Sequence, residues 1–337
     1  MKPHFILPVL AAAGILGIAN QSLLAQTTIF NDTFGNGSTI QTAPSTPTAN
    51  STTYEIFQQG GTPANFSIGA GDLHFSGRNT QSVLTEAQAL FTSSPVTLGT
   101  IGDSLNLSIT FTDTASIFPS GAPSTLNIGL YNSHSSPPVT GVRLDSTGSG
   151  TGGAIGWDGY VARIGGTGGA NSAIFTRPPQ GPSTNPNQSQ DVLFNGASGS
   201  GSYTNPTGML VATTGGQLAS GLAQASTYTL SYTITLSGAG TLTISNALID
   251  SGNTVLLSQI GKTSTSIETT FDALGFGWRY NNPPPGVTAA SSADISSIIV
   301  SDNISPVPEP SIFAIAGLAA AGLMRRRLRR RTFEEKP

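Results

Sequence analysis

The stretch TYTLSYTITL, residues 227–236, decides the fold class, because large apolar residues alternate in it with threonine or serine. A period of two places all the apolar side chains on one face of an extended strand. The residues SGAG, 237–240, come next, and TLTIS, 241–245, then resumes the alternation. The pattern predicts a β-hairpin with one buried face.

Shorter apolar runs occur along most of the chain, each bounded by Gly, Pro, Asn or Asp, which favour turns. None has helical periodicity, apart from one turn expected near residues 85–89. We therefore predict an all-β chain with a single two-sheet β-sandwich over residues 26–304 and a long loop at 165–208; a two-domain split at that loop is the alternative. Strands are expected at residues 73–75, 104–112, 126–131, 159–164, 254–259, 271–280 and 295–300.

The composition excludes several classes of function. Charged residues make up 9% of the chain, and residues 26–310 carry 15 acidic against six basic side chains, a net charge of −9. An acidic body argues against nucleic acid as a partner. Because the sequence has no cysteine, thiol catalysis, cysteine zinc sites and iron–sulfur clusters are excluded.

The first 25 residues are typical of a secretory signal peptide. Lys2 precedes an apolar run over residues 5–19, and cleavage is predicted after Ala25, although Leu23 is a slightly bulky residue for the −3 position. A buried N-terminal helix is the alternative, but the run lacks amphipathic periodicity. We expect export of the rest of the chain.

The C-terminus has three consecutive parts: the linker and motif at 305–310, containing Val307-Pro308-Glu309-Pro310, an apolar stretch from residue 311, and a basic cluster. The prolines keep the motif extended, and the apolar stretch predicts a membrane helix within residues 311–331. Moving one arginine to the centre of a membrane helix costs about 2.5–3.5 kcal/mol, so the cluster should stay in the cytoplasm. It comprises Arg325, Arg326, Arg327, Arg329, Arg330 and Arg331.

These three parts together resemble the PEP-CTERM sorting domain of Gram-negative bacteria. The resemblance covers about 25 residues, and the tail from Thr332 to Pro337 departs from it by running past the basic cluster. It implies processing by an exosortase, a membrane protease, and an association with extracellular polysaccharide. An ordinary tail anchor is the alternative. The expected location is the cell surface or extracellular matrix, with transient anchoring in the cytoplasmic membrane.

A second resemblance concerns the body of the chain. The stretches FNDTF, 30–34, and FDALGFGWR, 271–279, and the strand before the tag are similar to concanavalin-like, laminin-G-type jelly rolls. The resemblance implies that the strand near residues 28–30 lies beside the one near 295–300.

Candidate groups for catalysis are sparse. Glu55, Glu86 and Glu268 are far apart in sequence, and no nucleophile elbow has suitable partners. His74 and His134 are too widely separated to predict zinc, and His74 is expected to face solvent. No cofactor is expected, although the loops at 157–159 and 32–37 could supply the oxygen ligands of a structural calcium ion.

Three aromatic residues, Trp157, Trp278 and Tyr280, could stack on a sugar, with core packing as the commoner use. We therefore expect a non-enzymatic surface or matrix protein. A carbohydrate-binding module associated with exopolysaccharide is the alternative, and a polysaccharide-active enzyme is the least favoured, because paired carboxylates are missing from the pattern.

Overall fold

The computed structural model contains an all-β sandwich, and no helix able to cross a membrane occurs among the residues it describes. The predicted signal peptide and the predicted sorting tag, with its basic cluster, lie outside the described residues. The structure describes residues 26–35, 54–58, 66–69, 71–77, 83–115, 117–118, 124–138, 143–144, 154–167, 172–179, 191–193, 209–212, 216–263, 268–280 and 291–305.

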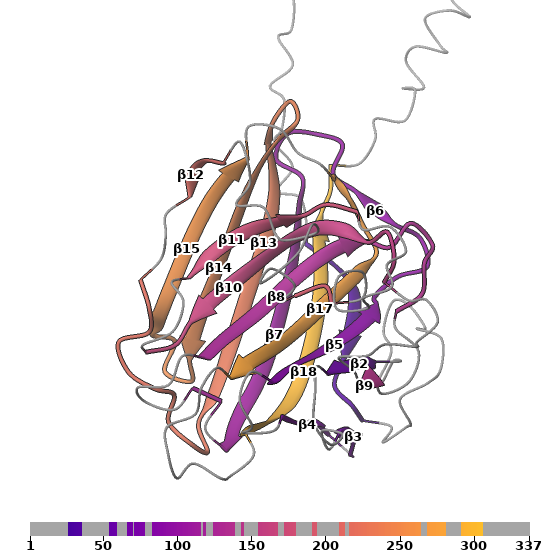
Figure 1. Ribbon diagram of the computed structural model, residues 1–337. Helices are drawn as coiled ribbons and strands as arrows, with labels where there is room; N and C mark the ends of the chain where they lie inside the picture. The colour runs from indigo at the N-terminus through magenta and orange to yellow at the C-terminus, as the bar shows by residue number, and fades with distance from the viewer. Residues whose placement is uncertain are drawn as a thin grey trace, which may run out of the picture.

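Two sheets face each other and form the layers of the sandwich (Figure 1). Sheet A consists, in order, of β12 (Met209–Ala212), β15 (Val255–Thr263), β14 (Thr241–Asp250), β13 (Thr227–Gly238), β7 (Ser104–Ala115), β18 (Ser291–Asn303), β4 (Leu73–Gly77) and β3 (Phe66–Ile68), and β1 (Thr27–Asp32) also pairs with β18. Sheet B consists of β11 (Ala173–Arg177), β10 (Asp158–Gly165), β8 (Ser124–Asn132), β17 (Ala273–Tyr280), β5 (Val83–Leu90), β2 (Glu55–Gln58) and β9 (Arg143–Leu144). A separate pair joins β6 (Val96–Thr97) to β16 (Thr270–Phe271).

The predicted hairpin is confirmed as β13 and β14. Leu236 pairs with Leu242, and a register shift then brings Gly238 opposite Thr241. Gly240 in the turn has φ +65°, a conformation that glycine adopts without steric cost. Every second side chain of both strands points to the inner face of sheet A, the face toward sheet B, as the period-two pattern requires.

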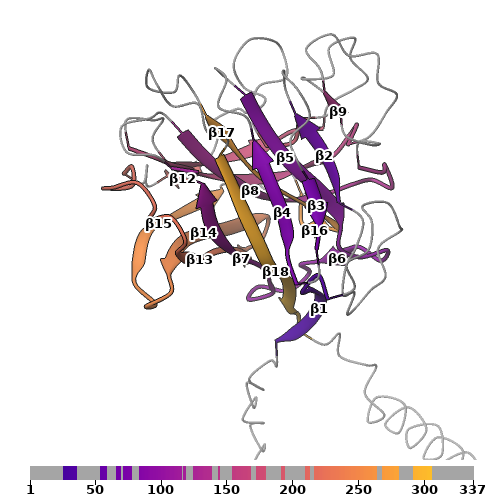
Figure 2. The ribbon, with the colours of Figure 1, turned by 90° about the horizontal axis from the view of Figure 1, so that it is seen from below.

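The two ends of the domain lie side by side, as predicted. β1 runs antiparallel to β18, and Phe30 is opposite Val300 (Figure 2). A bulge between Thr28 and Phe30 adjusts the register. Because the first and last strands complete the same sheet, the sandwich closes only when the whole body of the chain has folded.

Two apolar clusters stabilise the layers. The main core fills the space between the sheets and includes Phe111, Tyr232 and Trp278. A smaller set, which we call the outer cluster, lies on the outer face of sheet B, the face away from sheet A. It consists of Tyr131, Ala154, Trp157, Val161, Val192, Leu193 and Ala273, with Leu90 packed against it.

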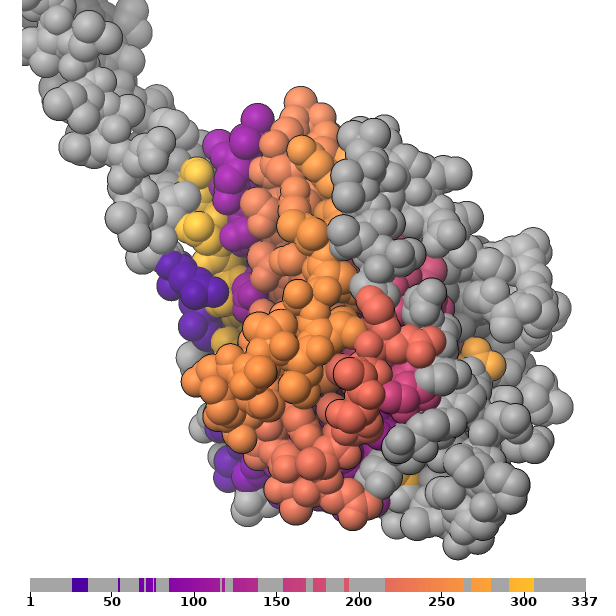
Figure 3. Space-filling view, turned by 90° about the vertical axis from the view of Figure 1, so that its left-hand side faces the viewer, coloured from indigo at the N-terminus to yellow at the C-terminus, as the bar shows by residue number. Residues whose placement is uncertain are grey.

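The outer face of sheet A has a different character. Its three central strands carry half-buried hydroxyl and amide side chains there, among them Asn106 of β7, Thr233 of β13 and Thr243 of β14. Asn106 donates a hydrogen bond to Thr233 across the strands, with a nitrogen–oxygen distance of 2.8 Å. Figure 3 shows β13, β14 and β15 open on this side of the molecule.

Two sequence predictions are corrected. Residues 85–89, expected to contain a helical turn, belong to β5, which pairs with both β17 and β2. Residues 173–177, inside the predicted loop 165–208, form β11 at the edge of sheet B. At residues 85–89, pairing with the neighbouring strands outweighs the local preference of residues such as Glu86 and Ala87 for helix.

Candidate functional site

Three segments bring ligating side chains to one end of sheet B. β8 ends at Asn132 and is followed by a turn that carries His134, while β10 begins at Asp158, directly opposite Asn132. Glu268 precedes β16 and the start of β17. Because β8 is antiparallel to both β10 and β17, the end of β8 and the starts of the other two strands meet at the same edge.

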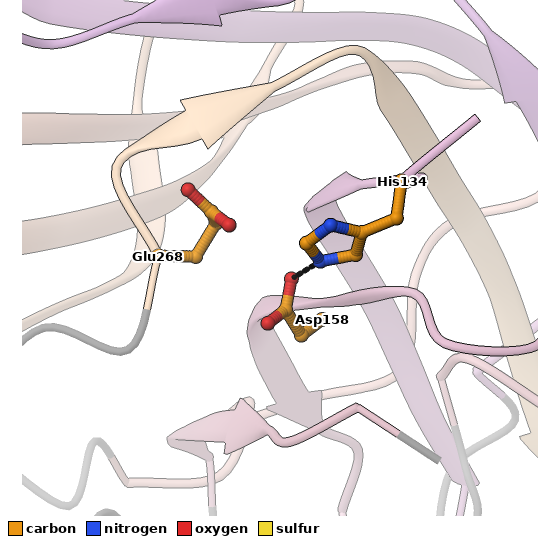
Figure 4. A group of neighbouring side chains, drawn as sticks. All are labelled: His134, Asp158 and Glu268. Carbon is orange, nitrogen blue, oxygen red and sulfur yellow. Dashed lines mark hydrogen bonds and ion pairs between the residues drawn. The ribbon is translucent and has the colours of Figure 1, made fainter. Parts of the chain in front are cut away.

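His134, Asp158 and Glu268 form a compact group, which we call the cation site (Figure 4). Each contributes one ligating atom, and these atoms all lie within 4.8 Å of one another. His134 Nε2 is 2.9 Å from Asp158 Oδ1. The carboxylate of Glu268 lies beside the imidazole–carboxylate pair, to its left in Figure 4.

The turn that carries His134 is fixed by several hydrogen bonds. The His134 and Ser135 backbones have φ of +50° and +64°, a region that side-chain-bearing residues adopt only when their surroundings require it. The His134 N–H donates to Asn132 Oδ1 at 2.9 Å. Asp272 accepts bonds from the backbone N–H and the hydroxyl of Ser133, at 2.6 and 2.7 Å. These contacts hold the imidazole at the site before any ligand binds.

Glu268 is positioned equally firmly. Its Oε1 accepts the backbone N–H groups of Thr269 and Thr270, at 2.6 and 2.5 Å. Its Oε2 accepts Asn132 Nδ2 at 2.8 Å, and its carbonyl accepts the Tyr160 hydroxyl at 3.1 Å. The carboxylate is therefore oriented by Asn132 of β8 and by its own segment, while Tyr160 of β10 holds the Glu268 backbone.

Burial makes negative charge unfavourable at this edge of the sheet. Desolvation raises the pKa of Asp158, and the charge of Glu268 raises it further, while the hydrogen bond from His134 lowers it. Desolvation also raises the pKa of Asp272, against the lowering effect of the Ser133 hydrogen bonds. A bound cation would relieve the unfavourable charge of these carboxylates.

The donor set indicates which cation would fit. One imidazole nitrogen and two carboxylates suit Zn²⁺ or Mn²⁺, whereas Ca²⁺ takes oxygen ligands alone. The sequence pointed to calcium at residues 157–159, and Asp158 of that loop does belong to the site. In the second predicted calcium loop, Asp32 accepts bonds from the Phe34 N–H and the Tyr54 hydroxyl, at 2.8 and 3.0 Å.

Both tryptophans are core residues, the commoner of the two uses expected for them, and the sugar-stacking possibility fails for both. Trp278 is 3% exposed in the main core, and its Nε1 donates to Ser291 Oγ at 3.0 Å. Trp157 is fully buried against Tyr131, and its Nε1 donates to the Ser136 carbonyl. Neither ring can reach a glycan, and the side chain of Tyr280 lies outside the described residues.

The sequence carried a signal for the burial of Trp278 that the sugar prediction did not use. Leu274, Phe276 and Trp278 occupy alternate positions of β17, and three large apolar residues of equal parity predict an inward face. No comparable signal linked His134 to Glu268, because they are 134 positions apart and neither lies in a metal-binding motif. His74, expected to face solvent, is half-buried and bonds Asp294 at 2.6 Å.

Comparison with known proteins decides the nature of the C-terminus. The family model described as the PEP-CTERM protein-sorting motif matches residues 306–331. The chain carries a PEP-CTERM protein-sorting motif. The match contains the four residues of the predicted motif and all six arginines of the basic cluster. A PEP-CTERM motif implies export to the cell envelope, so the sequence recognition is confirmed.

The body of the chain is similar to solved structures of lectins, and no curated protein matches its sequence. Peanut lectin with a nine-residue peptide shares 13% identity and a TM-score of 0.37, covering 84% of this chain and all of its own. Arcelin-5, a lectin-like defense protein from Phaseolus vulgaris, shares 13% identity with a TM-score of 0.40, over 83% of this chain and all of its own. At these TM-scores the likeness says nothing about ligand or activity.

Proposed function

We propose that the protein is an exported, non-enzymatic component of the cell surface or extracellular matrix that displays its β-sandwich outside the cytoplasmic membrane. The PEP-CTERM motif at residues 306–331 carries this proposal. An exosortase would cut near Glu309, after the helix and the basic cluster had held the chain transiently in the membrane.

The end of the sandwich suits this arrangement. β18 ends at Asn303, and the Ser305 N–H donates to Asp103 Oδ1 at 2.8 Å. The sorting motif begins at the next residue of the chain. The sandwich is therefore ordered up to the motif, so cleavage near Glu309 would leave the fold intact.

A non-catalytic role is supported by how the carboxyl groups are used. Glu86 is fully buried and accepts the backbone N–H groups of Val192 and Leu193. Glu268 is bonded through both oxygens to its neighbours. Carboxyl groups that cleave polysaccharide must instead face the substrate from opposite sides of the scissile bond.

Intact-mass measurement of the protein exported by a host that has an exosortase tests this proposal. We expect a mature C-terminus near Glu309, and retention of the full C-terminus when Glu309 and both flanking prolines are replaced by alanine. A matched triple substitution to alanine in the tail, at Phe333, Glu334 and Glu335, should leave processing unchanged. A full-length C-terminus on the exported wild-type protein would contradict the proposal.

We further propose that the cation site binds a divalent cation, because its three ligating atoms lie within 4.8 Å of one another. The ion would replace the hydrogen bond between His134 Nε2 and Asp158 Oδ1, and binding would weaken at low pH because the ligands must be deprotonated. It would join the turn after β8 to the start of β10 and to the segment before β16. Its role would be structural.

Calorimetric titration of the metal-free protein with Zn²⁺, Mn²⁺ and Ca²⁺ separates the alternatives. We expect Zn²⁺ or Mn²⁺ to bind most tightly and His134→Ala to weaken binding at least tenfold. His74→Ala is the matched control, since His74 also pairs with one carboxylate, at 2.6 Å, but is not part of the group. Equal binding by wild type and His134→Ala would show that the imidazole is not a ligand.

A further inference from the structure

Two buried carboxyl groups, those of Glu86 and Asp191, lie close together on the outer face of sheet B. Glu86 Oε1 accepts the N–H of Val192, and Glu86 Oε2 accepts the N–H of Leu193, both at 3.0 Å. Asp191 Oδ1 accepts the same Leu193 N–H, also at 3.0 Å. Since both oxygens are 3.0 Å from one nitrogen, they are at most 6.0 Å apart. Glu86 is fully buried, and Asp191 is 1% exposed.

The rest of residues 191–193 is attached to β8. The Tyr131 hydroxyl donates to the Val192 carbonyl at 2.7 Å, and Asn127 Nδ2 donates to the Leu193 carbonyl. The Val192 and Leu193 side chains complete the outer cluster. Residues 191–193 thus cover this part of sheet B through hydrogen bonds to its polar side chains and through apolar packing.

Glycines of β17 make this close approach feasible. A Cβ at Gly275 would lie 3.0 Å from Val192 Cγ2, and a Cβ at Gly277 would lie 3.0 Å from Glu86 Cβ. Both glycines point to the outer face, because Phe276 between them lies in the main core. The GFG sequence of β17 therefore leaves space on the outer face for both Glu86 and Val192.

Two carboxylates this close in a buried setting cannot both be ionised without a large loss of stability. Desolvation raises the pKa of Glu86 well above its usual range, and the charge of Asp191 raises it further, whereas the Val192 N–H lowers it. Arg177 of β11, buried nearby, donates to the Trp157 carbonyl. The other titratable groups on the strands packed against the pair are Tyr131 of β8, Arg279 of β17 and Glu55 of β2.

We propose that residues 191–193 form a proton-dependent latch, closed on the outer cluster while Glu86 and Asp191 share one proton and released when that proton is lost. The direction of the pH dependence follows from the direction of the pKa shift. A carboxyl group that binds its proton more tightly when buried stabilises the closed form at low pH, and this stabilisation is lost as the pH rises. Release would bring Trp157 and its apolar neighbours into contact with water.

Hydrogen exchange of the Val192 and Leu193 amides in the full chain, followed by mass spectrometry between pH 5 and 9, tests the latch. After correction for intrinsic exchange, release of one proton should raise the exchange rate by up to about tenfold per pH unit between the pKa of the carboxyl group in the open form and its raised pKa in the closed form, and the rate should level off at higher pH. Glu86→Gln, which removes the carboxyl group whose pKa is raised, should give a corrected rate independent of pH. Asp191→Asn removes only the neighbouring charge and leaves Glu86 buried, so it should make the rise with pH smaller.

The fluorescence of Trp157 in a Trp278→Phe background gives a second readout. Its emission should shift to longer wavelength over the same pH range in the protein with Glu86, and stay constant with Glu86→Gln. Asp113→Asn, in sheet A, is the matched control and should not move the transition. A pH-independent corrected rate in wild type, or an unchanged transition in Glu86→Gln, would refute the latch.

Discussion

The two outer faces of the sandwich are built from different side chains and have different surroundings. On sheet A, β13 and β14 alternate strictly between buried and half-buried residues, and the outward side chains are mostly Thr and Ser. On sheet B, nearly every residue of β8 and β10 is buried. The outward side chains of β13 and β14 are half-buried, whereas Trp157 and residues 191–193 pack on the outer face of sheet B.

This difference explains why the Glu86 contacts and the cation site both belong to sheet B. Hydroxyl groups on an open face can bond water or each other, as Thr112 and Thr227 do at 3.1 Å, so few of them need a particular partner. Buried polar groups each need a defined partner. Glu86 therefore meets backbone N–H groups on sheet B, and the cation site lies at the end of the same sheet.

The largest effect is expected from closing the space beside Glu86. In Gly277→Ala, the new Cβ would be 2.1 Å from the Thr85 carbonyl oxygen, a backbone atom that cannot move without breaking the β17–β5 pairing. We expect a loss of about 3 kcal/mol or more in the free energy of unfolding. Gly238→Ala in sheet A, whose nearest neighbour would be Thr241 Cβ at 3.5 Å, should be nearly neutral. Denaturant unfolding of both variants measures the contrast.

The second prediction concerns the titration of Asp113 in sheet A, which is separate from the proposed latch in sheet B. Burial raises the pKa of Asp113 to about 6, although its carboxylate accepts the Ile117 N–H. Because the folded state holds this proton more tightly, stability is highest at low pH and falls as the pH rises from about 4 to 6. The loss should amount to about 3 kcal/mol, and Asp113→Asn should remove it. Melting temperatures of wild type and Asp113→Asn at several pH values would show whether stability still falls with pH in the variant.

Removing one hydroxyl beneath residues 191–193 should have a moderate effect. Tyr131→Phe leaves the Val192 carbonyl without its 2.7 Å donor and keeps the ring that packs on Trp157. An unsatisfied buried carbonyl costs about 1–3 kcal/mol. The Val192 and Leu193 amides should also exchange faster at neutral pH. Unchanged exchange would mean that Glu86 alone holds the segment.

The smallest effect is expected on the open face of sheet A. Thr243→Val replaces a half-buried outward hydroxyl with a methyl group of similar volume and keeps β-branching. We expect a change within about 0.5 kcal/mol, measured by thermal unfolding. A loss comparable to that in Tyr131→Phe would show that the hydroxyl face of sheet A has specific partners after all.

Much of the fold followed from local pattern. Alternation in residues 227–236 specified which side chains of β13 are buried, and the pairing of β1 with β18 was expected from the resemblance of the chain ends to jelly rolls. The strands at 85–89 and 173–177 did not follow, because their pattern is weak and pairing with β17 and β10 determines them. The direction in which Trp278 points was left open between a sugar-binding face and the core, although its parity with Leu274 and Phe276 indicated the core.

The sequence by itself determined the sorting motif, because contiguous residues carry it, and the buried face of each strongly alternating strand, because successive side chains point to opposite sides. Only the tertiary structure decided which distant residues meet. Sheet order and register brought His134 to Asp158 and Glu268, and placed residues 191–193 over Glu86. A period of two specifies the face on which a side chain lies. It does not specify what covers that face, since this depends on how segments more than a hundred residues apart pack together.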